Sequence, residues 1–407
     1  MMLDKFQLGL EVLLKDKELK AQLKGKRVAL IGHPASTDCE LTHSLDLLMN
    51  DPEIYLVAGF GPQHGMKGEK QYNMEESSDY IHEKYEIPIF SLYGDVRHPS
   101  KKMMESFDVV LFDLQDIGCR IYTYLTSLVY MLEACNEYQD KALWVLDRPN
   151  PAGRNVEGSY LLPNLESFVG AAPLLMRHGL TSGEIANWYK QKKNLDNLDL
   201  KVVRMSNYNP NEASSYGWPD GDLPWVNPSP NIPNLASTKM FSGTVLLEGT
   251  RISEGRGTTI PLQVFGAPEL DAESIYREMV EIKEDWLKGC YLRTCFFEPT
   301  FNKHQGVNCS GIQIHLDHKY LLHSEFRPYR LMAVYFRAIR NLYPSYEIWH
   351  SFHYEYEKEK MPIDMLTGSS FYREWVDNQD ATFEELDTFL LSEEQLWLEE
   401  RADFLLY

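Results

Sequence analysis

Five short apolar stretches decide the fold of this chain: RVALIG (27–32), IYLVAGF (54–60), IPIFSLYG (87–94), DVVLFDL (108–114) and KALWVLD (141–147). They are rich in Val, Ile, Leu and Phe and lack polar alternation, which is typical of strands buried on both faces. Segments in which apolar residues recur at helical spacing lie between them. This alternation predicts an α/β fold in which helices cover both faces of a parallel sheet.

The same patterns predict further elements along the chain. Helices are expected from near Asp38 through Leu48, over 122–138, over 175–192 with a capping box formed by Thr181 and Glu184, and near 271–289, 325–342 and 382–405. Strands are expected over 244–249 and 311–316. Residues 205–235 contain so many prolines that they predict a long ordered loop or a lid. We expect two domains, residues 1–245 with most of the site and a smaller domain over 246–407 that closes the cleft.

The charge balance limits what the chain binds. Its 407 residues carry 60 acidic and 40 basic side chains, a formal net charge of −20 at pH 7. This balance repels phosphate backbones and anionic lipid, and the basic stretches at 101–102 and 190–193 are short and isolated. We therefore expect a small-molecule ligand, with no nucleic-acid or membrane partner; oligomeric state is not indicated.

The cysteines and the N-terminus favour a cytoplasmic location. The six cysteines form no CxxC pair, and no Cys and His spacing fits zinc, so we expect reduced thiols and no metal. The first 20 residues mix charges into apolar positions, unlike a secretory signal peptide. No stretch approaches the roughly 20 apolar residues that cross a bilayer.

Polar residues at the ends of the predicted strands are the first candidates for a site, because open parallel sheets bind ligands beyond the carboxyl ends of their strands. These residues are Ser36 after the first strand, Gln63, His64 and Glu69 after the second, Tyr93 after the third, Asp113 and Asp116 after the fourth, and Asp147, Arg148 and Asn150 after the fifth. Five polar strand ends that meet at one edge of the sheet predict a site there from the fold alone.

Three pairs have both a structural and a functional interpretation: Asp113 with Asp116, Asp147 with Arg148, and Arg177 with His178. The first pair is either two cooperating carboxylates or a strand exit followed by a helix N-cap. The second is either an internal ion pair that holds a turn or part of a substrate site. The third pair, Arg177 with His178, is likewise either structural or part of a substrate site.

Two glycine-flanked motifs are more suggestive. His64 lies in PQHG (62–65), where contact with a ligand or proton handling is favoured over core packing. In SEGRGT (253–258) two glycines bracket Arg256 next to Glu254, which suits a loop close to a polar ligand, with a tight turn as the alternative. By contrast, GFGPQHG (59–65) departs from the GxGxxG spacing of dinucleotide sites, so no cofactor is expected.

A set of longer motifs resembles a known family over nearly the whole chain: FGPQHGMKGEKQ (60–71), SLYGDVRHP (91–99), FDLQDIGCRIYTY (112–124), LDRPNPAGRNVEG (146–158), FVGAAPLLMRHGLTSGE (168–184), LPWVNPSPNIP (223–233), LLEGTRISEGRGTT (246–259), PTFNKHQGVNCSG (299–311) and PIDMLTGS (362–369). This family was long labelled a domain of unknown function (DUF1343) and is now classed as exo-β-N-acetylmuramidases. The resemblance implies a Rossmann-like parallel-sheet N-terminal domain, a smaller α/β C-terminal domain and a cleft between them. It also implies a hydrolase of cell-wall recycling that releases non-reducing terminal N-acetylmuramic acid from peptidoglycan fragments.

One position departs from the family pattern. The family motif commonly reads Pro-Glu-His-Gly, and its Glu is the suspected catalytic acid/base, whereas this chain has Gln63. An amide cannot donate or take the proton that glycosidic cleavage requires. Either His64 or one of the glutamates at 69, 75 and 76 takes over, or the acetamido group of the substrate reacts with help from Asp113 or Asp116. In the third interpretation, the chain binds a muramyl sugar without cleaving it, or processes another glycan.

The implied ligand is anionic, because muramic acid carries a lactyl carboxylate. We expect one or two arginines within the matching motifs to clamp it: Arg120, Arg148, Arg177, Arg251 or Arg256. The leading hypothesis is an exo-acting glycosidase with catalytic residues His64, Glu69, Asp113 and Asp116. Its expected substrate-binding residues are Gln63, Ser36, Tyr93, Arg120, Asp147, Arg148, Asn150, Arg177, His178, Glu254 and Arg256. The alternatives are a non-catalytic muramyl-sugar-binding protein and a hydrolase of a different glycan.

Overall fold

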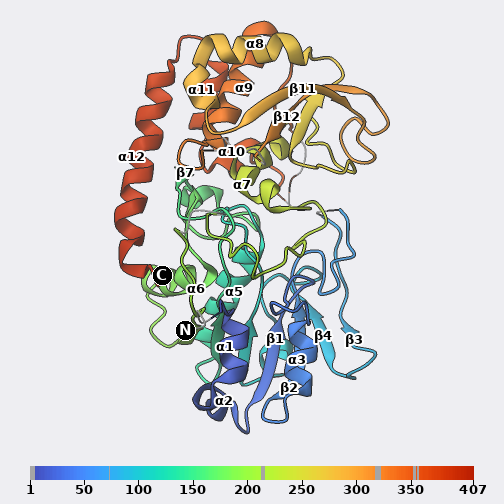
Figure 1. The fold of residues 1–407 in the computed structure, drawn as a ribbon, viewed down its shortest axis with the longest axis vertical. Helices are drawn as coiled ribbons and strands as arrows, with labels where there is room; N and C mark the ends of the chain where they lie inside the picture. Colours follow the sequence, from blue (N-terminus) through green and yellow to red (C-terminus); the bar gives the residue numbers. More distant parts are fainter. Residues whose placement is uncertain (1–4, 73, 212–215, 317–321, 352–353, 355–356) are drawn as a thin grey trace.

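The structure is a computed structural model that describes residues 5–72, 74–211, 216–316, 322–351, 354 and 357–407 (Figure 1). Its larger sheet has seven strands in the order β3-β4-β2-β1-β5-β6-β9. These are β1 (Arg27–Ile31), β2 (Tyr55–Gly61), β3 (Tyr80–Ile81), β4 (Pro88–Ser91), β5 (Val109–Phe112), β6 (Ala142–Leu146) and β9 (Asp199–Val203). All neighbours pair in parallel except β3, which is antiparallel to β4. The five predicted strands are confirmed as β1, β2, β4, β5 and β6.

Helices cover both faces of this sheet. They are α1 (Gly9–Lys15), α2 (Lys17–Leu23), α3 (Ser44–Asn50), α4 (Lys101–Met104), α5 (Tyr124–Glu137) and α6 (Ser182–Lys192). Val28 and Leu30 of β1 pack into the same hydrophobic cluster as α1 and α3, whereas Ala29 and Ile31 pack into the cluster that contains α5 and α6. Successive strand residues point to opposite faces, so a strand covered on both sides needs apolar residues throughout.

The second half of the chain is a smaller α/β unit, as predicted. It contains an antiparallel sheet of β10 (Val264–Ala267), β12 (Cys309–His315) and β11 (Tyr291–Phe297). Its helices are α7 (Leu235–Thr244), α8 (Ala272–Lys283), α9 (Pro328–Leu342), α10 (Pro362–Thr367), α11 (Phe371–Asp377) and α12 (Phe383–Arg401), with 3₁₀ turns at Val245–Gly249, Glu284–Leu287 and Ala402–Phe404. The small hairpin β7 (Glu157–Tyr160) and β8 (Leu175–Arg177) adds a further sheet. The domain boundary after residue 245 stays a prediction.

Several element predictions are wrong in part. The strand expected over 244–249 is the end of α7 and a 3₁₀ turn, because a short apolar run that is buried on all sides does not distinguish strand from helix. The helix expected over 175–192 begins at Ser182; Thr181 and Glu184 form the predicted capping box, and 175–177 are β8. The helix expected near Asp38 begins at Ser44. The loop predicted over 205–235 is confirmed for its described residues up to 234, which form no α-helix or strand, whereas Leu235 already begins α7.

The last helix joins the two halves. In Figure 1, α12 runs along the outside of the molecule, from the second half to the first, and leaves the C-terminus beside α6. The Trp397 indole and the Arg401 guanidinium of α12 both donate to the carbonyl oxygen of His178, at 2.7 and 3.0 Å. Across the described residues, no helix is long and apolar enough to cross a membrane.

Candidate functional site

A cavity lies where the carboxyl ends of the large sheet meet the second half. Its lining residues enclose about 490 Å³ of space, part of which is open to solvent. Its lining comes from the loop after β2 (Gln63, His64), the segment that enters α5 (Ile121, Tyr122, Thr123, Tyr124), Val169, the Pro-rich loop (Ser229, Asn231, Ile232) and the second half (Phe241, Val245, Glu248, Arg256, Leu262, Tyr354). The described lining is therefore shared by both halves of the chain.

The PQHG turn brings Gln63 and His64 to this cavity. The amide N–H of Gly65 donates to the Pro62 carbonyl oxygen at 2.9 Å, and His64 and Gly65 have φ values of 72° and 78°. Glycine adopts this left-handed conformation readily, and histidine adopts it more easily than most side chains. The Thr123 hydroxyl donates to Gln63 Oε1 at 2.6 Å, which orients the amide.

His64 is held in its neutral form. Burial lowers its pKa to about 4, and the positive charge of Arg256 contributes. The ring contacts the Lys70 carbonyl oxygen, which lies 2.6 Å from Nδ1. A carbonyl oxygen only accepts, so Nδ1 carries the proton and Nε2 keeps its lone pair. The ring can therefore accept a proton at Nε2.

A charged network of the second half contributes Glu248, Arg256 and Tyr354 to the cavity lining. Arg256 Nη2 lies 2.5 Å from Glu248 Oε1, and Arg256 Nε donates to Glu254 Oε1 at 2.7 Å. The Tyr354 hydroxyl donates to Glu248 Oε2 at 2.5 Å, and Lys303 Nζ lies 2.7 Å from Glu254 Oε2. Burial alone would raise the pKa of Glu254, but the charges of Lys303 and Arg256 hold it at about 2. Among the described lining residues, Glu248 is the one carboxylate.

The SEGRGT motif is the tight turn that the sequence allowed. The Thr258 amide N–H donates to the Gly255 carbonyl oxygen at 3.1 Å, and Gly255 has a φ of 70°. A β-carbon at Gly255 would lie 2.6 Å from a methyl group of Val264, so no larger residue fits. The turn places Arg256 between Glu248 and Glu254, so it serves both the local fold and the cavity.

Asp113 and Arg148 lie behind the strand ends and do not line the cavity. Arg148 Nε donates to Asp113 Oδ1 at 2.6 Å, and Ser44 Oγ donates to Asp113 Oδ2. Ser36 Oγ donates to the Asp113 carbonyl oxygen. Of the two interpretations of Asp147 with Arg148, the internal ion pair is wrong, because Arg148 reaches across to Asp113 at the neighbouring strand end instead. These contacts tie the ends of β1, β5 and β6 together.

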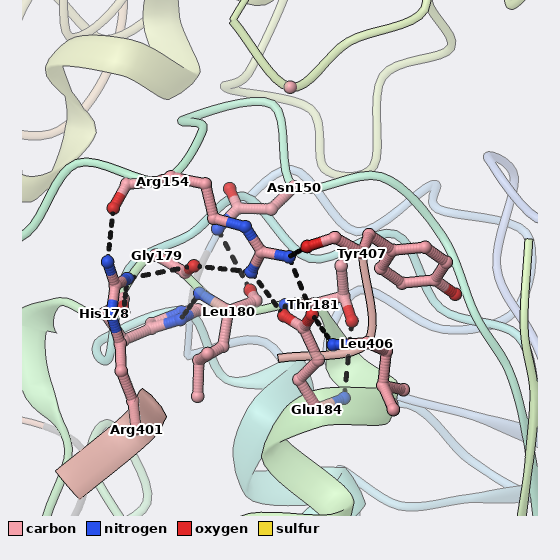
Figure 2. Close-up of polar contacts among 12 residues, drawn as sticks. Asn150, Arg154, His178, Gly179, Leu180, Thr181, Glu184, Arg401, Leu406 and Tyr407 are labelled. Atoms are coloured by element: carbon pink, nitrogen blue, oxygen red, sulfur yellow. Dashed lines mark hydrogen bonds and ion pairs between the residues drawn. The ribbon is translucent and has the colours of Figure 1, made fainter. Parts of the chain in front are cut away.

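The C-terminal residues Leu406 and Tyr407 lie beside Arg154 and Glu184 (Figure 2), and Tyr407 reaches Asp147 at the end of β6. Asp147 accepts hydrogen bonds from Thr181 Oγ1 at 2.7 Å and from the Tyr407 hydroxyl at 2.8 Å. Arg154 forms two bonds with Glu184, at 2.5 and 2.7 Å, and Glu184 also accepts from the Leu406 amide N–H at 2.8 Å. Asn150, whose Nδ2 donates to the Leu180 carbonyl oxygen, lies in the same group. Asp147 and Asn150 are thus away from the cavity.

The remaining candidates also lie outside the cavity lining. Asp116 Oδ2 accepts from the Gly118 amide at 2.7 Å and lies 3.4 Å from His178 Nε2, while α5 has Thr123, not Asp116, at its N-cap. Buried Arg120 donates to three carbonyl oxygens, those of Ser159, Leu174 and Leu366. Tyr93 is buried against Phe168, Glu69 is exposed, and Arg251 pairs with Glu347 at the surface. The predicted set therefore contributes Gln63, His64 and Arg256 to the cavity, with Glu254 behind Arg256.

Sequence reasoning missed Glu248. It lies in LLEGT (246–250), which the apolar pattern assigned to a strand. A single acid within a run of buried apolar residues was the available signal, since a buried carboxylate needs a charged or hydrogen-bonding partner. In the described part of the chain, no group of three or more His, Cys, Asp or Glu side chains is placed to hold a metal ion.

Comparisons with known proteins agree with this two-part architecture. Two sequence patterns match: "Exo-beta-N-acetylmuramidase NamZ, N-terminal" over residues 28–236 and "Exo-beta-N-acetylmuramidase NamZ, C-terminal" over residues 239–407. The curated peptidoglycan β-N-acetylmuramidase NamZ of Bacillus subtilis (strain 168) is 40% identical over 342 residues, which cover 84% of this chain and 79% of that protein.

Two solved structures share the fold. Both are DUF1343 family proteins from Bacteroides fragilis, and each match covers 99% of both chains. One is 28% identical with a TM-score of 0.85, and the other is 26% identical with a TM-score of 0.73. With both domain patterns matched in order and a curated relative aligned over most of its length, the chain belongs to the exo-β-N-acetylmuramidase NamZ family.

Proposed function

We propose that this protein is an exo-β-N-acetylmuramidase that binds the non-reducing terminal N-acetylmuramic acid of peptidoglycan fragments in the cavity between its two halves. The observation that carries the proposal is the convergence of Gln63, His64 and Glu248 on one cavity in a chain of this family. The relative from Bacillus subtilis acts on peptidoglycan, by its description. We also propose a cytoplasmic location, which the six free cysteines support.

The residues that line the cavity suggest a separate role in cleavage for each of Glu248, His64 and Gln63. Glycosidic cleavage passes through a transition state with positive charge at the anomeric carbon. Glu248, oriented by Arg256 and Tyr354, is placed to stabilise this charge. His64 takes a proton from the attacking water at Nε2. The amide of Gln63 donates a hydrogen bond, rather than a proton, to the leaving oxygen, which takes its proton from solvent water as the glycosidic bond breaks.

The disaccharide of N-acetylmuramic acid and N-acetylglucosamine tests this function directly. We expect the native protein to release N-acetylmuramic acid when it is the non-reducing sugar, with the products followed by chromatography. The disaccharide with the reverse order of sugars is the matched control, and an exo-acting enzyme of this specificity leaves it intact. Binding without cleavage of the first disaccharide would support a sugar-binding protein instead.

A Gln63→Glu variant should be the faster enzyme. The carboxyl group replaces an amide of the same shape, keeps the hydrogen bond from Thr123 and supplies a proton to the leaving oxygen. General acid catalysis contributes about 10²–10⁴-fold, so we expect kcat to rise by about 10²-fold or more. Gln63→Met, which keeps the size without a titratable group, is the control. An unchanged rate in Gln63→Glu would show that this position does not handle the leaving group.

His64 should make the protein sensitive to acid. An unfolded histidine titrates near pH 6.5, whereas folded His64 has its pKa lowered to about 4. Between these values the unfolded state binds more protons, so the stability from neutral His64 is complete above pH 6.5 and is lost progressively as the pH falls from 6.5 to 4. From pH 7 to 4, urea denaturation should show a loss about 3 kcal/mol larger for the native protein than for His64→Asn. Asparagine tolerates the left-handed backbone at this position, so equal losses would refute this role of burial.

A further inference from the structure

Four basic side chains gather away from the cavity, where β8, α7 and the segment before α9 meet. We name this group the basic cluster; it consists of Arg177, Lys239, His323 and Arg327. The segment 152–156 touches three of its members: Arg177 Nη2 donates to the Ala152 carbonyl oxygen at 2.6 Å, Asn155 Nδ2 to the His323 carbonyl oxygen at 2.7 Å, and Arg327 Nη1 to the Val156 carbonyl oxygen at 3.2 Å. This segment therefore ties Arg177, Arg327 and the backbone of His323 together.

Three members of the basic cluster are buried and Arg327 is half-buried, and their charges repel one another. Arg177 is 3% exposed, Lys239 9% and His323 8%. Burial, and then the charge of Arg177, lowers the pKa of Lys239 to about 8. Burial, and then the charges of Lys239 and Arg177, lowers the pKa of His323 to about 3. These side chains are thus close enough to sense one another's charge within a region of low polarity.

Buried donors of the cluster lack acceptors. Arg177 Nε and Nη1 are buried without a hydrogen-bond partner. Lys239 is 9% exposed, and among the described residues its Nζ forms no hydrogen bond or ion pair. Two carboxylates influence these charges: Glu157 accepts hydrogen bonds from the Tyr329 and Arg330 amides, and Asp220 is exposed to solvent. Burying a cation without a partner costs several kcal/mol, so the arrangement favours an added negative group.

Arg177 differs from the other buried arginines that the sequence suggested as ligands of an anion, because the guanidinium groups of those arginines already have partners. Arg148 is bound to Asp113, and Arg256 to Glu248 and Glu254. Arg120 bonds three carbonyl oxygens through Nη1 and Nη2. Of the buried arginines of that set, Arg177 is the one that combines unused guanidinium donors with a second buried cation beside it.

We propose that the basic cluster is a binding site for a small oxyanion, a carboxylate or a phosphoryl group, between β8 and α7. Phe241 and Val245 of α7 line the cavity, whereas Lys239 lies two residues before Phe241, about 160° around the helix. The site is therefore separate from the cavity and does not rest on the proposed function. Arg177 lies in the part matched by the N-terminal family pattern and Lys239 in the part matched by the C-terminal one. An anion between them clamps the two parts together.

Thermal unfolding in inorganic phosphate and in sodium lactate tests the site, with sodium chloride at the same ionic strength as the control. A ligand that binds only the folded state raises Tm, and at about 100 times its Kd we expect a rise of about 2–8 °C beyond that in chloride. A shift with phosphate alone identifies a phosphoryl site, one with lactate alone a carboxylate site, and one with both a general oxyanion site. No shift beyond chloride with either anion overturns the proposal.

A Lys239→Met variant tests whether the rise in Tm comes from an anion bound at the basic cluster. Removing an uncompensated buried charge should raise Tm in anion-free buffer, and the same change should abolish the shift with phosphate or lactate. Lys17→Met, at an exposed lysine of α2, is the matched control and should keep the full shift. An undiminished shift in Lys239→Met places the anion elsewhere and overturns the assignment. Arg177→Gln provides a second variant, in which calorimetric phosphate affinity should fall at least tenfold.

Discussion

Glu248→Gln is expected to lower kcat for release of N-acetylmuramic acid about 10²–10⁴-fold. Among the described lining residues Glu248 is the one carboxylate, and Arg256 and Tyr354 hold it by contacts of 2.5 Å each. Glutamine keeps the shape but cannot offer a negative charge to the anomeric centre. Because the substrate still enters an unchanged cavity, KM should change much less than kcat. Steady-state kinetics on a chromogenic muramide measure both.

The control for this variant is Glu347→Gln, a surface glutamate of the second half that is 74% exposed and pairs with Arg251. It should keep native kcat. Since Glu248→Gln also removes the charged partner of Arg256 at the cavity, thermal unfolding must show that the variant is folded at the assay temperature. A folded Glu248→Gln protein with native kcat would remove Glu248 from the proposed mechanism.

Asp113→Asn is expected to cost about 3–5 kcal/mol of stability, because it leaves the buried Arg148 guanidinium without its counter-ion. The two side chains are 0% and 3% exposed, and Nε and Oδ1 are 2.6 Å apart. Urea denaturation measures the loss. Asp113 lies outside the cavity lining, so kcat per folded molecule should stay near the native value.

A double variant tests whether the loss of stability comes from the unpaired charge of Arg148 or from the changed packing. Asp113→Leu combined with Arg148→Met removes both charges and fills the space with apolar atoms, so we expect it to recover at least half of the stability that Asp113→Asn loses. The contact from Arg148 to the Thr37 carbonyl oxygen is lost as well, which limits the recovery. A fall of kcat by 10²-fold or more in folded Asp113→Asn would return Asp113 to the catalytic group.

The local pattern of apolar residues was sufficient to predict most strands of the larger sheet. The strands from β1 to β6, apart from β3, were predicted because burial on both faces demands continuous apolar runs. The edge strand β9 was missed. Its first residues, Asp199, Leu200 and Lys201, are exposed or half-buried, so they do not form a continuous apolar run. The apolar run at 245–247 was assigned to the wrong element, because a fully buried 3₁₀ turn and a buried strand need the same residues.

For the candidate site as well, local patterns predicted some residues correctly and failed for others. Gln63, His64 and Arg256 were predicted because glycines around them signal a turn that exposes polar groups, and all three line the cavity. Asp147 and Asn150 were predicted from their place after a strand, yet the C-terminal residue Tyr407 and the loop around Leu180 occupy their polar groups. No local pattern reveals that a segment some 260 positions away returns to cover a strand end.

The amino-acid order alone therefore determined the parallel sheet, the turn that carries Gln63 and His64, and a net charge of −20 that disfavours polyanions. These follow from local periodicity, turn chemistry and composition. Tertiary structure alone decided which charges face a ligand. It paired Arg148 with Asp113, brought Glu248 to the cavity and left Arg177 and Lys239 without acidic partners among the described residues. The physical reason is that an ion pair forms between groups that packing brings within a few ångströms, whatever their separation along the chain.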